Sequence, residues 1–184
     1  ERKPDAHKGT YGHLLVVAGS IGKSGAAALA GRAALRSGVG LCTVATAVSQ
    51  QPIVAGFSME VMTEPLPETA AQSISFKAKD RVLELASQRD AVALGPGLSL
   101  DPESQALARA LVAELDRPMV VDADALSALA GHLDLLDLAP APRVLTPHPG
   151  EMARMLGTSI AEVEADRIET VREFCARHHV HLVL

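Results

Sequence analysis

Apolar runs of strand length alternate along this chain with segments of helical period, and this alternation limits the folds open to it. Such an alternation predicts repeated strand-helix units and a mainly parallel sheet. We therefore expect an α/β fold, a central sheet flanked by helices, in a single domain over residues 1–184. Strands are expected at 14–18, 41–46, 58–63, 91–94, 118–121 and 143–146, and helices at about 26–38, 77–87, 102–115 and 159–177, with shorter ones ending at Gly131 and Gly157.

The composition indicates tight packing of helices on this sheet and argues against two classes of partner. Apolar residues make up 48% of the chain but aromatic ones only 2%, so Ala, Leu and Val must fill the core. A net charge of -5 without a basic stripe argues against nucleic acid, and no apolar run is long enough for a membrane span. Cys42 and Cys175 lie in apolar patterns without metal-ligand spacing, which predicts buried thiols in a reducing compartment, the cytoplasm.

The unusual residues of this sequence gather in four loops, each directly after a predicted strand. The carboxyl ends of parallel strands share one edge of a sheet, and ligands of open α/β sheets bind outside that edge. We therefore expect the four loops to line one cleft. They are GSIGKSG (19–25), GPGLS (95–99), DADAL (122–126) and TPHPGE (146–151).

The first loop raises the question of a phosphate-binding P-loop, whose pattern is G-x-x-x-x-G-K-[ST]. If Gly22, Lys23 and Ser24 take the last three places, Val17 stands where the first glycine belongs. Val17 also belongs to a predicted strand, so the loop is too short to wrap a phosphate in that manner. It predicts either a plain strand-to-helix turn or a helix start whose free backbone N–H groups face a ligand.

The second and third loops allow both a binding role and a structural one. The glycines of GPGLS let a ligand approach the backbone closely, but Pro-Gly is also common turn chemistry. Asp122 and Asp124 are candidates to polarise a hydroxyl or to hold a metal-bound phosphate. An aspartate after a strand is also often the N-cap of the next helix, and we expect that role for Asp124.

TPHPGE is the most specific of the four loops. Two prolines bracket His148 and fix the backbone on both sides of it. A histidine held there beside Glu151 can donate to a phosphate or accept from a hydroxyl, and a solvated loop histidine is the alternative. A second group of histidines lies near the end of the chain, where we expect no metal site. Its members are His178, His179 and His181.

Taken in order, these motifs resemble the NAD(P)H-hydrate dehydratase family, which has a three-layer, ribokinase-like fold. The resemblance covers essentially the whole chain and implies repair of hydrated NADH and NADPH. It implies that ADP or ATP, with Mg²⁺, phosphorylates the added hydroxyl and that loss of the phosphate restores the double bond. The motifs are HKGTYG (7–12), GSIGKSG with the helix after it, GPGL, VVDADAL and LTPHPGE.

The resemblance also implies which residues bind the hydrated dinucleotide. Three positions match the family's binding residues, and three more stand beside them in the same loops. Backbone groups at the helix start would make the contact in GSIGKSG, and Lys23 would not act as a P-loop lysine. The matching positions are Ala26, Gly97 and His148, and their neighbours are Gly25, Asp122 and Glu151.

Two motifs of the family do not occur in this sequence. A KG-x-x-T phosphate loop and a GTGD-like motif, whose aspartate is the proposed base, would follow the strand that begins at His181. We therefore expect a C-terminally incomplete chain, with the nucleotide site and the catalytic aspartate beyond Leu184. The chain alone is expected to be inactive.

Two other functions remain open at this point. One is a ribokinase-like kinase for a small alcohol such as a vitamin precursor, which uses the same phosphoryl-transfer electrostatics. The other is a non-catalytic module that keeps only the nucleotide-binding half of the cleft. The apolar helices also predict a homo-oligomer, such as a tetramer.

Overall fold

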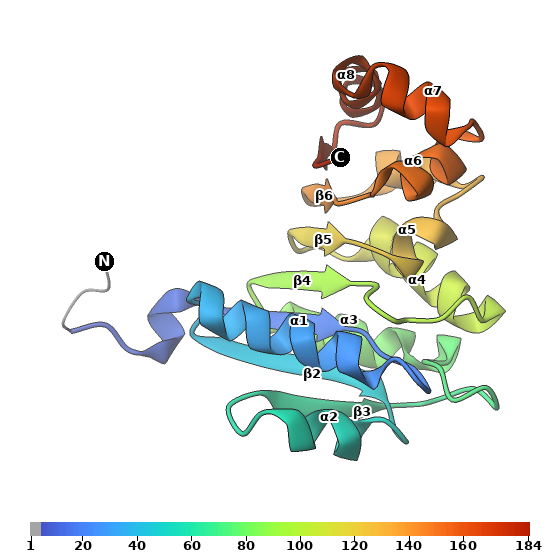
Figure 1. The fold of residues 1–184 in the computed structure, drawn as a ribbon. Coiled ribbons are helices and arrows are strands. Elements are labelled where there is room, and N and C mark those ends of the chain that lie inside the picture. Colours follow the sequence, from blue (N-terminus) through green and yellow to red (C-terminus); the bar gives the residue numbers. More distant parts are fainter. Residues whose placement is uncertain (1–4) are drawn as a thin grey trace.

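The computed structural model describes residues 5–184, which form one seven-stranded parallel sheet covered by helices (Figure 1). The strand order is β3-β2-β1-β4-β5-β6-β7. The sheet confirms the predicted α/β class with parallel strands. Its strands are β1 (His13–Val17), β2 (Leu41–Ala47), β3 (Met62–Leu66), β4 (Ala91–Leu94), β5 (Met119–Val121), β6 (Arg143–Leu145) and β7 (His181–Leu182).

Eight α-helices and three short 3-10 helices connect these strands in the described part of the chain. The α-helices are α1 (Ser24–Ser37), α2 (Gln51–Phe57), α3 (Lys79–Ser87), α4 (Pro102–Glu114), α5 (Asp124–Ala128), α6 (Pro149–Leu156), α7 (Ile160–Ala165) and α8 (Arg167–His178). The 3-10 helices are Lys8–Tyr11, Phe76–Ala78 and Leu133–Leu138.

The direction of winding reverses between β1 and β4. The chain first builds β1, β2 and β3 toward one edge, then crosses back to place β4 beside β1 and continues to β7. Alternate side chains of β1 enter different cores, since Val16 packs with α1 and α2 whereas Leu15 and Val17 pack with α3 and α4. This arrangement gives three layers and a topological switch point between β1 and β4.

Small residues let α1 lie close to the sheet. A Cβ atom on Gly31 would come within 2.7 Å of Val44 Cγ2, so a larger residue there would push the helix away. Ala27 and Ala28 are buried in the same contact. The Ala-rich, aromatic-poor composition is thus used as predicted, in close helix-on-sheet packing.

Arg143, at the start of β6, is 1% exposed and anchors the end of α4. Its guanidinium donates to the carbonyl oxygens of Val112 at 2.9 Å, Leu115 at 2.6 Å and Arg117 at 3.0 Å. These carbonyls belong to the last turn of α4 and the segment after it, which have no partners within the helix. Burial lowers the pKa of Arg143 to about 10.

Two element predictions were wrong in position or continuity. The strand expected at 58–63 lies at 62–66, because α2 occupies residues 51–57 and a turn follows it. The helix expected over 159–177 does begin with the Ser159 capping box, but it breaks at Asp166. Asp166 leaves the helical region (φ -149°, ψ 84°) and caps α8 by accepting a hydrogen bond from the Glu169 N–H at 2.9 Å.

The cysteines only half follow the prediction of buried thiols. Cys42 is fully buried in β2, and burial raises the pKa of its thiol to about 11. Cys175 is half-buried on α8.

Within residues 5–184, helices cover both faces of the sheet at β1 and β2 but only one face at β5, where Val120 is 38% exposed. No helix in this part of the chain is long and apolar enough to cross a membrane.

Candidate functional site

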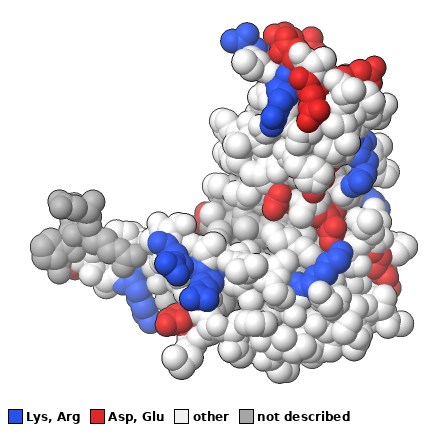
Figure 2. Space-filling model, viewed as in Figure 1, with Lys and Arg blue, Asp and Glu red and all other residues white. Residues whose placement is uncertain are grey.

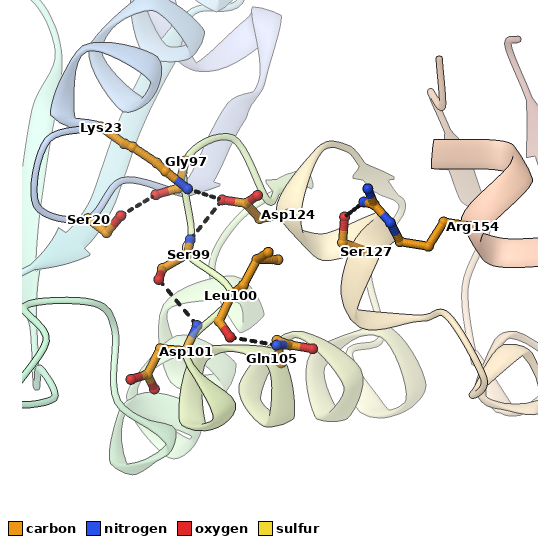
Figure 3. A network of polar contacts seen from close by, with 10 residues as sticks. All are labelled: Ser20, Lys23, Gly97, Ser99, Leu100, Asp101, Gln105, Asp124, Ser127 and Arg154. Atoms are coloured by element: carbon orange, nitrogen blue, oxygen red, sulfur yellow. Dashed lines mark hydrogen bonds and ion pairs between the residues drawn. The ribbon is translucent and has the colours of Figure 1, made fainter. Parts of the chain in front are cut away.

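The four loops singled out in the sequence lie side by side at the carboxyl edge of the sheet. They follow β1, β4, β5 and β6, which are consecutive neighbours in the strand order. The first two, GSIGKSG and GPGLS, flank the switch point, where open α/β sheets bind their ligands. Hydrogen bonds then join each loop to the next, as Figure 3 shows for the first three.

Ser20 and Gly97 connect the first loop to the second. The Ser20 hydroxyl donates to the Gly97 carbonyl at 2.8 Å (Figure 3). The Gly19 N–H also donates to the Pro96 carbonyl, at 3.0 Å. Ser20 is 2% exposed, so this connection is shielded from water. The two loops therefore form a rigid pair at the switch point.

Ala26 and Gly97, two of the predicted binding residues, are in direct contact. A Cβ atom on Gly97 would lie 3.2 Å from Ala26 Cβ, 2.9 Å from Lys23 Cβ and 3.0 Å from the Lys23 carbonyl oxygen. Gly97 also has φ +65°, a left-handed conformation that favours glycine. Gly25 precedes Ala26 in α1, and a Cβ there would meet open space.

Asp124 does not have the helix-capping role expected of it. It is the first residue of α5, and the residue before it, Ala123, provides no side-chain cap. Asp124 Oδ2 instead accepts hydrogen bonds from the Ser99 N–H at 2.8 Å and from Lys23 Nζ at 3.0 Å (Figure 3). The capping prediction was wrong because the side chain turns away from its own helix toward the two neighbouring loops.

Asp122 connects the third loop to the fourth. Its Oδ1 accepts a hydrogen bond from the Thr146 hydroxyl at 2.8 Å. The Asp122 backbone also lies against the second loop, since a Cβ on Gly95 would come within 1.9 Å of the Asp122 carbonyl oxygen. Gly95 has φ +125° and is buried. These contacts hold three loops together around one aspartate.

His148 is the N-cap of α6 and forms a reciprocal capping box with Glu151. Its Nδ1 accepts hydrogen bonds from the backbone N–H groups of Gly150 at 3.0 Å and Glu151 at 3.3 Å. Glu151 Oε2 in turn accepts from the His148 N–H at 3.0 Å. The imidazole is therefore held by its own helix, and this capping role was not predicted from the sequence.

The cap also fixes which nitrogen of His148 is free to donate. Because Nδ1 accepts two hydrogen bonds, the proton of a neutral ring is on Nε2. Nε2 lies 3.4 Å from Glu151 Oε1, and the His148 side chain is 67% exposed whereas that of Glu151 is 13% exposed. His148 thus presents an oriented N–H to solvent or to a ligand.

The predicted residues therefore occur on one rim but in two groups. Ala26, Gly97 and Gly25 lie at the switch point, and His148 with Glu151 lies two strands away, connected through Asp122. The sequence analysis missed the contacts of three further rim residues. These are Ser20, Lys23 and Ser99.

Little in a single sequence could have revealed these contacts. Lys23 pairs with Asp124 across 101 positions, and Ser20 with Gly97 across 77. The available signal was that Lys23 is the single Lys or Arg in the four loops.

A hollow of about 680 Å³ lies away from this rim, between α1 and the end of α2. Phe57 and Arg32 are among its lining residues. Because the loops with the unusual residues do not line it, its size alone does not make it the functional site.

The histidines near the end of the chain have structural contacts. His178 is 6% exposed, its Nδ1 lies 3.3 Å from Asp137 Oδ1, and its ring packs on Phe174 with 4.8 Å between centroids. Within residues 5–184, no three His, Cys, Asp or Glu side chains are arranged to hold a metal ion.

The fold and the rim define a doubly wound α/β protein whose candidate ligand site is at the switch point of the sheet. A comparison with protein families is more specific, since the model of the NAD(P)H-hydrate dehydratase family matches residues 14–184. The chain therefore belongs to the NAD(P)H-hydrate dehydratase family, as the order of its motifs predicted.

Curated relatives agree with this family. The chain is 45% identical over 183 residues to the bifunctional NAD(P)H-hydrate repair enzyme Nnr of Moorella thermoacetica, and the match covers 100% of this chain and 34% of the relative. It is 35% identical to the ADP-dependent (S)-NAD(P)H-hydrate dehydratase of Bacillus subtilis, covering 100% of this chain and 61% of that protein. The chain thus spans about a third of the bifunctional relative.

Solved structures show the same fold. The Bacillus subtilis ADP/ATP-dependent NAD(P)H-hydrate dehydratase, co-crystallised with ATP and Mg²⁺, matches with a TM-score of 0.77 and 32% identity over 100% of this chain and 61% of that one. A ribokinase-like superfamily protein of Enterococcus faecalis matches with a TM-score of 0.81 over 100% of this chain and 61% of its own. At 23% identity, the second match shows the fold alone. The predicted ribokinase-like fold is confirmed.

Proposed function

We propose that this protein takes part in the repair of nicotinamide nucleotides by dehydrating hydrated NADH and NADPH. The observation that supports this most is the hydrogen-bonded rim of four loops at the switch point, in a chain of the NAD(P)H-hydrate dehydratase family. A dinucleotide is long enough to need several loops, and the rim offers a continuous row of them.

The proposed chemistry is a phosphorylation followed by an elimination. ADP or ATP transfers its terminal phosphoryl group to the hydroxyl oxygen of the hydrated ring, and the hydroxyl proton is removed. The phosphate then leaves with the electrons of its C–O bond, and loss of a ring proton restores the double bond. Transfer of this kind depends mainly on positioning and charge stabilisation, which a rigid rim supports.

Ala26, Gly97 and His148 are the proposed binding residues for the hydrated dinucleotide. Lys23 and Ala26 fill the place of a Cβ on Gly97, so the second loop packs directly against the start of α1 at the switch point. His148 contributes the oriented Nε2–H described above, which can donate to a phosphate oxygen without a positive charge on the ring. Gly25, Asp122 and Glu151, which stand beside them in the same loops, are proposed as further binding residues.

Mg²⁺ is proposed to arrive with the phosphates of ADP or ATP. The carboxylates of the rim already have partners, because Asp122 accepts from Thr146 and Asp124 from Lys23. A magnesium ion that keeps most of its ligands from water and substrate phosphates fits such a rim better than a cage of protein ligands does.

Self-association is proposed for the face formed by α2. This helix, QPIVAGF, has only one residue that is not apolar, yet Ile53 is 47% exposed and Phe57 59% exposed. Met59, directly after it, is 98% exposed, and most of the surface at the α2 end of the molecule is uncharged in Figure 2. Charged side chains occur beside this face, where Arg32, Arg36 and Glu60 line the hollow next to Phe57. A helix that is apolar all round is normally covered, and we propose that a second copy of the chain covers this one.

This proposal is tested with a single substitution. Phe57→Glu should lower the mass measured by light scattering to that of a monomer, while Leu138→Glu, at a similarly exposed position on another part of the surface, should leave it unchanged. Equal masses for both variants would refute the assignment of this face. The proposed compartment is the cytoplasm, which suits the free thiols of Cys42 and Cys175.

The main proposal is tested by incubating the full-length protein with hydrated NADH and either ADP or ATP, with Mg²⁺. Return of the near-ultraviolet absorbance of the dihydronicotinamide ring, together with release of inorganic phosphate, supports the proposal. Phosphoryl transfer to a small alcohol without that absorbance would instead indicate a kinase.

A further inference from the structure

The candidate rim is rich in carboxylates and contains one basic side chain. Its loops hold Asp122, Asp124 and Glu151, and Lys23 is the single Lys or Arg among residues 19–25, 95–99, 122–126 and 146–151. The ligand under the proposed function is a dinucleotide with a negatively charged diphosphate. Three carboxylates repel such a group, so a cation at the rim would favour its binding.

Lys23 is placed where both loops of the switch point meet. Its Cβ and its carbonyl oxygen lie 2.9 Å and 3.0 Å from the position of a Cβ on Gly97, so its backbone packs against the second loop. Its side chain is 47% exposed and its Nζ lies 3.0 Å from Asp124 Oδ2 (Figure 3). An ammonium group has three N–H donors, so two remain for a ligand while the contact with Asp124 is kept.

Asp124 is held firmly in the position from which it contacts Lys23. The same oxygen, Oδ2, also accepts from the Ser99 N–H at 2.8 Å. Ser99 has φ +89° and Ala123, directly before Asp124, has φ +52° and ψ -120°, both unusual for residues with a side chain. Such backbone conformations persist only where surrounding contacts maintain them, and they are frequent at ligand sites.

A ligand can easily replace Asp124 as the partner of Lys23. An ion pair of this exposure contributes little to stability, so a phosphate oxygen can take over part of the Lys23 coordination at low cost. When no ligand is present, the contact with Asp124 favours conformations of Lys23 that stay at the rim.

We infer that Lys23 is a binding residue for the phosphate groups of the dinucleotide and that Asp124 is a positioning residue that holds Lys23 at the junction of the two loops. This inference rests on the proposed function, because it takes the diphosphate of hydrated NADH as the ligand group. Lys23 would thus bind phosphate although the GSIGKSG loop is too short to act as a P-loop.

Calorimetric titration of the full-length protein with hydrated NADH tests this inference at two salt concentrations. Lys23→Met should weaken binding about 10- to 150-fold at low salt, the range for one lost hydrogen bond between charged groups. The affinity of Lys23→Met should also depend less on the salt concentration than the affinity of the wild type. A purely structural role of Lys23 would not produce this difference. Lys23→Arg should restore most of the affinity.

Asp124→Asn separates positioning from folding, because the amide oxygen can still accept from the Ser99 N–H while the negative charge is lost. Its affinity should fall by about 1.4- to 5-fold, the range for an exposed pair, with an unchanged unfolding temperature. An affinity equal to or above that of the wild type would mean that Asp124 repels the ligand and does not position Lys23. Lys79→Met is the matched control, since Lys79 pairs with Glu114 at 2.6 Å on α3 and α4, away from the rim. It should leave affinity and salt dependence unchanged.

The outcomes distinguish this inference from the function on which it rests. If the wild type binds hydrated NADH and Lys23→Met binds it equally well, with the same salt dependence, the inference is wrong and the proposed function stands. If the wild type does not bind hydrated NADH at all, both are wrong.

Discussion

The Thr146 hydroxyl donates to Asp122 Oδ1 at 2.8 Å, and the two residues follow the neighbouring strands β6 and β5. Through this side-chain contact, the loop that carries His148 is joined to the loop after β5 and so to the rest of the rim. It makes the position of His148 depend on the pairing of β5 with β6.

Thr146→Val removes that connection with little change in shape. Loss of one hydrogen bond should lower the free energy of unfolding by about 0.5–1.5 kcal/mol and weaken dinucleotide binding through a less fixed His148 loop. Thr63→Val is the control, because Thr63 accepts from Gln51 Nε2 at 2.6 Å away from the rim. Chemical denaturation and calorimetry should show similar losses of stability but a loss of affinity only for Thr146→Val. Equal affinities would contradict a role for this contact in binding.

His148→Ala should weaken binding of the hydrated dinucleotide by about 10- to 150-fold, because one hydrogen bond to a charged phosphate is lost. It should also lower the free energy of unfolding by about 0.5–2 kcal/mol, since the N-cap of α6 is removed. The affinity for ADP or ATP, measured by the same titration, should change much less.

His148→Asn separates the two roles of the residue. Asparagine is a good N-cap, so stability should be kept while the Nε2 donor is lost. Affinity for the dinucleotide should fall as far as in His148→Ala. Wild-type affinity in the asparagine variant would limit His148 to its capping role.

Gly97→Ala should impair both stability and binding. The left-handed backbone at φ +65° costs about 1–2 kcal/mol for alanine, and the new Cβ would press on the Lys23 carbonyl oxygen at 3.0 Å. Gly131→Ala is the matched control, because Gly131 has φ +78° but no atom within 4 Å of a new Cβ. The unfolding temperature should fall for both variants, whereas calorimetry should show a lower affinity for the hydrated dinucleotide only for Gly97→Ala. The close contact with Ala26 would be unimportant if both variants bound equally.

Glu162 should make the stability depend on pH under acidic conditions. Hydrogen bonds from Thr158, from the Ser159 backbone and from the Ser159 hydroxyl lower the pKa of its carboxyl from 4.5 to about 2. Since the folded pKa is the lower one, the stabilisation is fully present above pH 4.5 and is lost as the pH falls toward 2. Glu162→Gln should therefore reduce the decline of the unfolding temperature over this range. Glu164→Gln removes the same charge from the same helix and should leave the decline unchanged.

Local features of this fold could be predicted from the sequence because they depend on neighbouring residues. Asp101 and Pro102 start α4 as expected, with the Asp101 side chain accepting from the Glu103 N–H at 2.9 Å. The Ser159 capping box forms for the same reason. The helix α2 could not be predicted, because its exposed face is as apolar as its buried one and gives no helical period.

The sequence by itself determined that four unusual loops follow strands, and with parallel strands this was enough to place them on one edge. Only the tertiary structure decided which loops are neighbours, because the order β1-β4-β5-β6 follows from the reversal of winding after β3. That order brings Lys23 to Asp124 and Ser20 to Gly97, which no pattern of neighbouring residues encodes. Asp124 shows the physical reason: a carboxylate next to a helix start and to a distant backbone N–H accepts from whichever donor the packed loops place within reach.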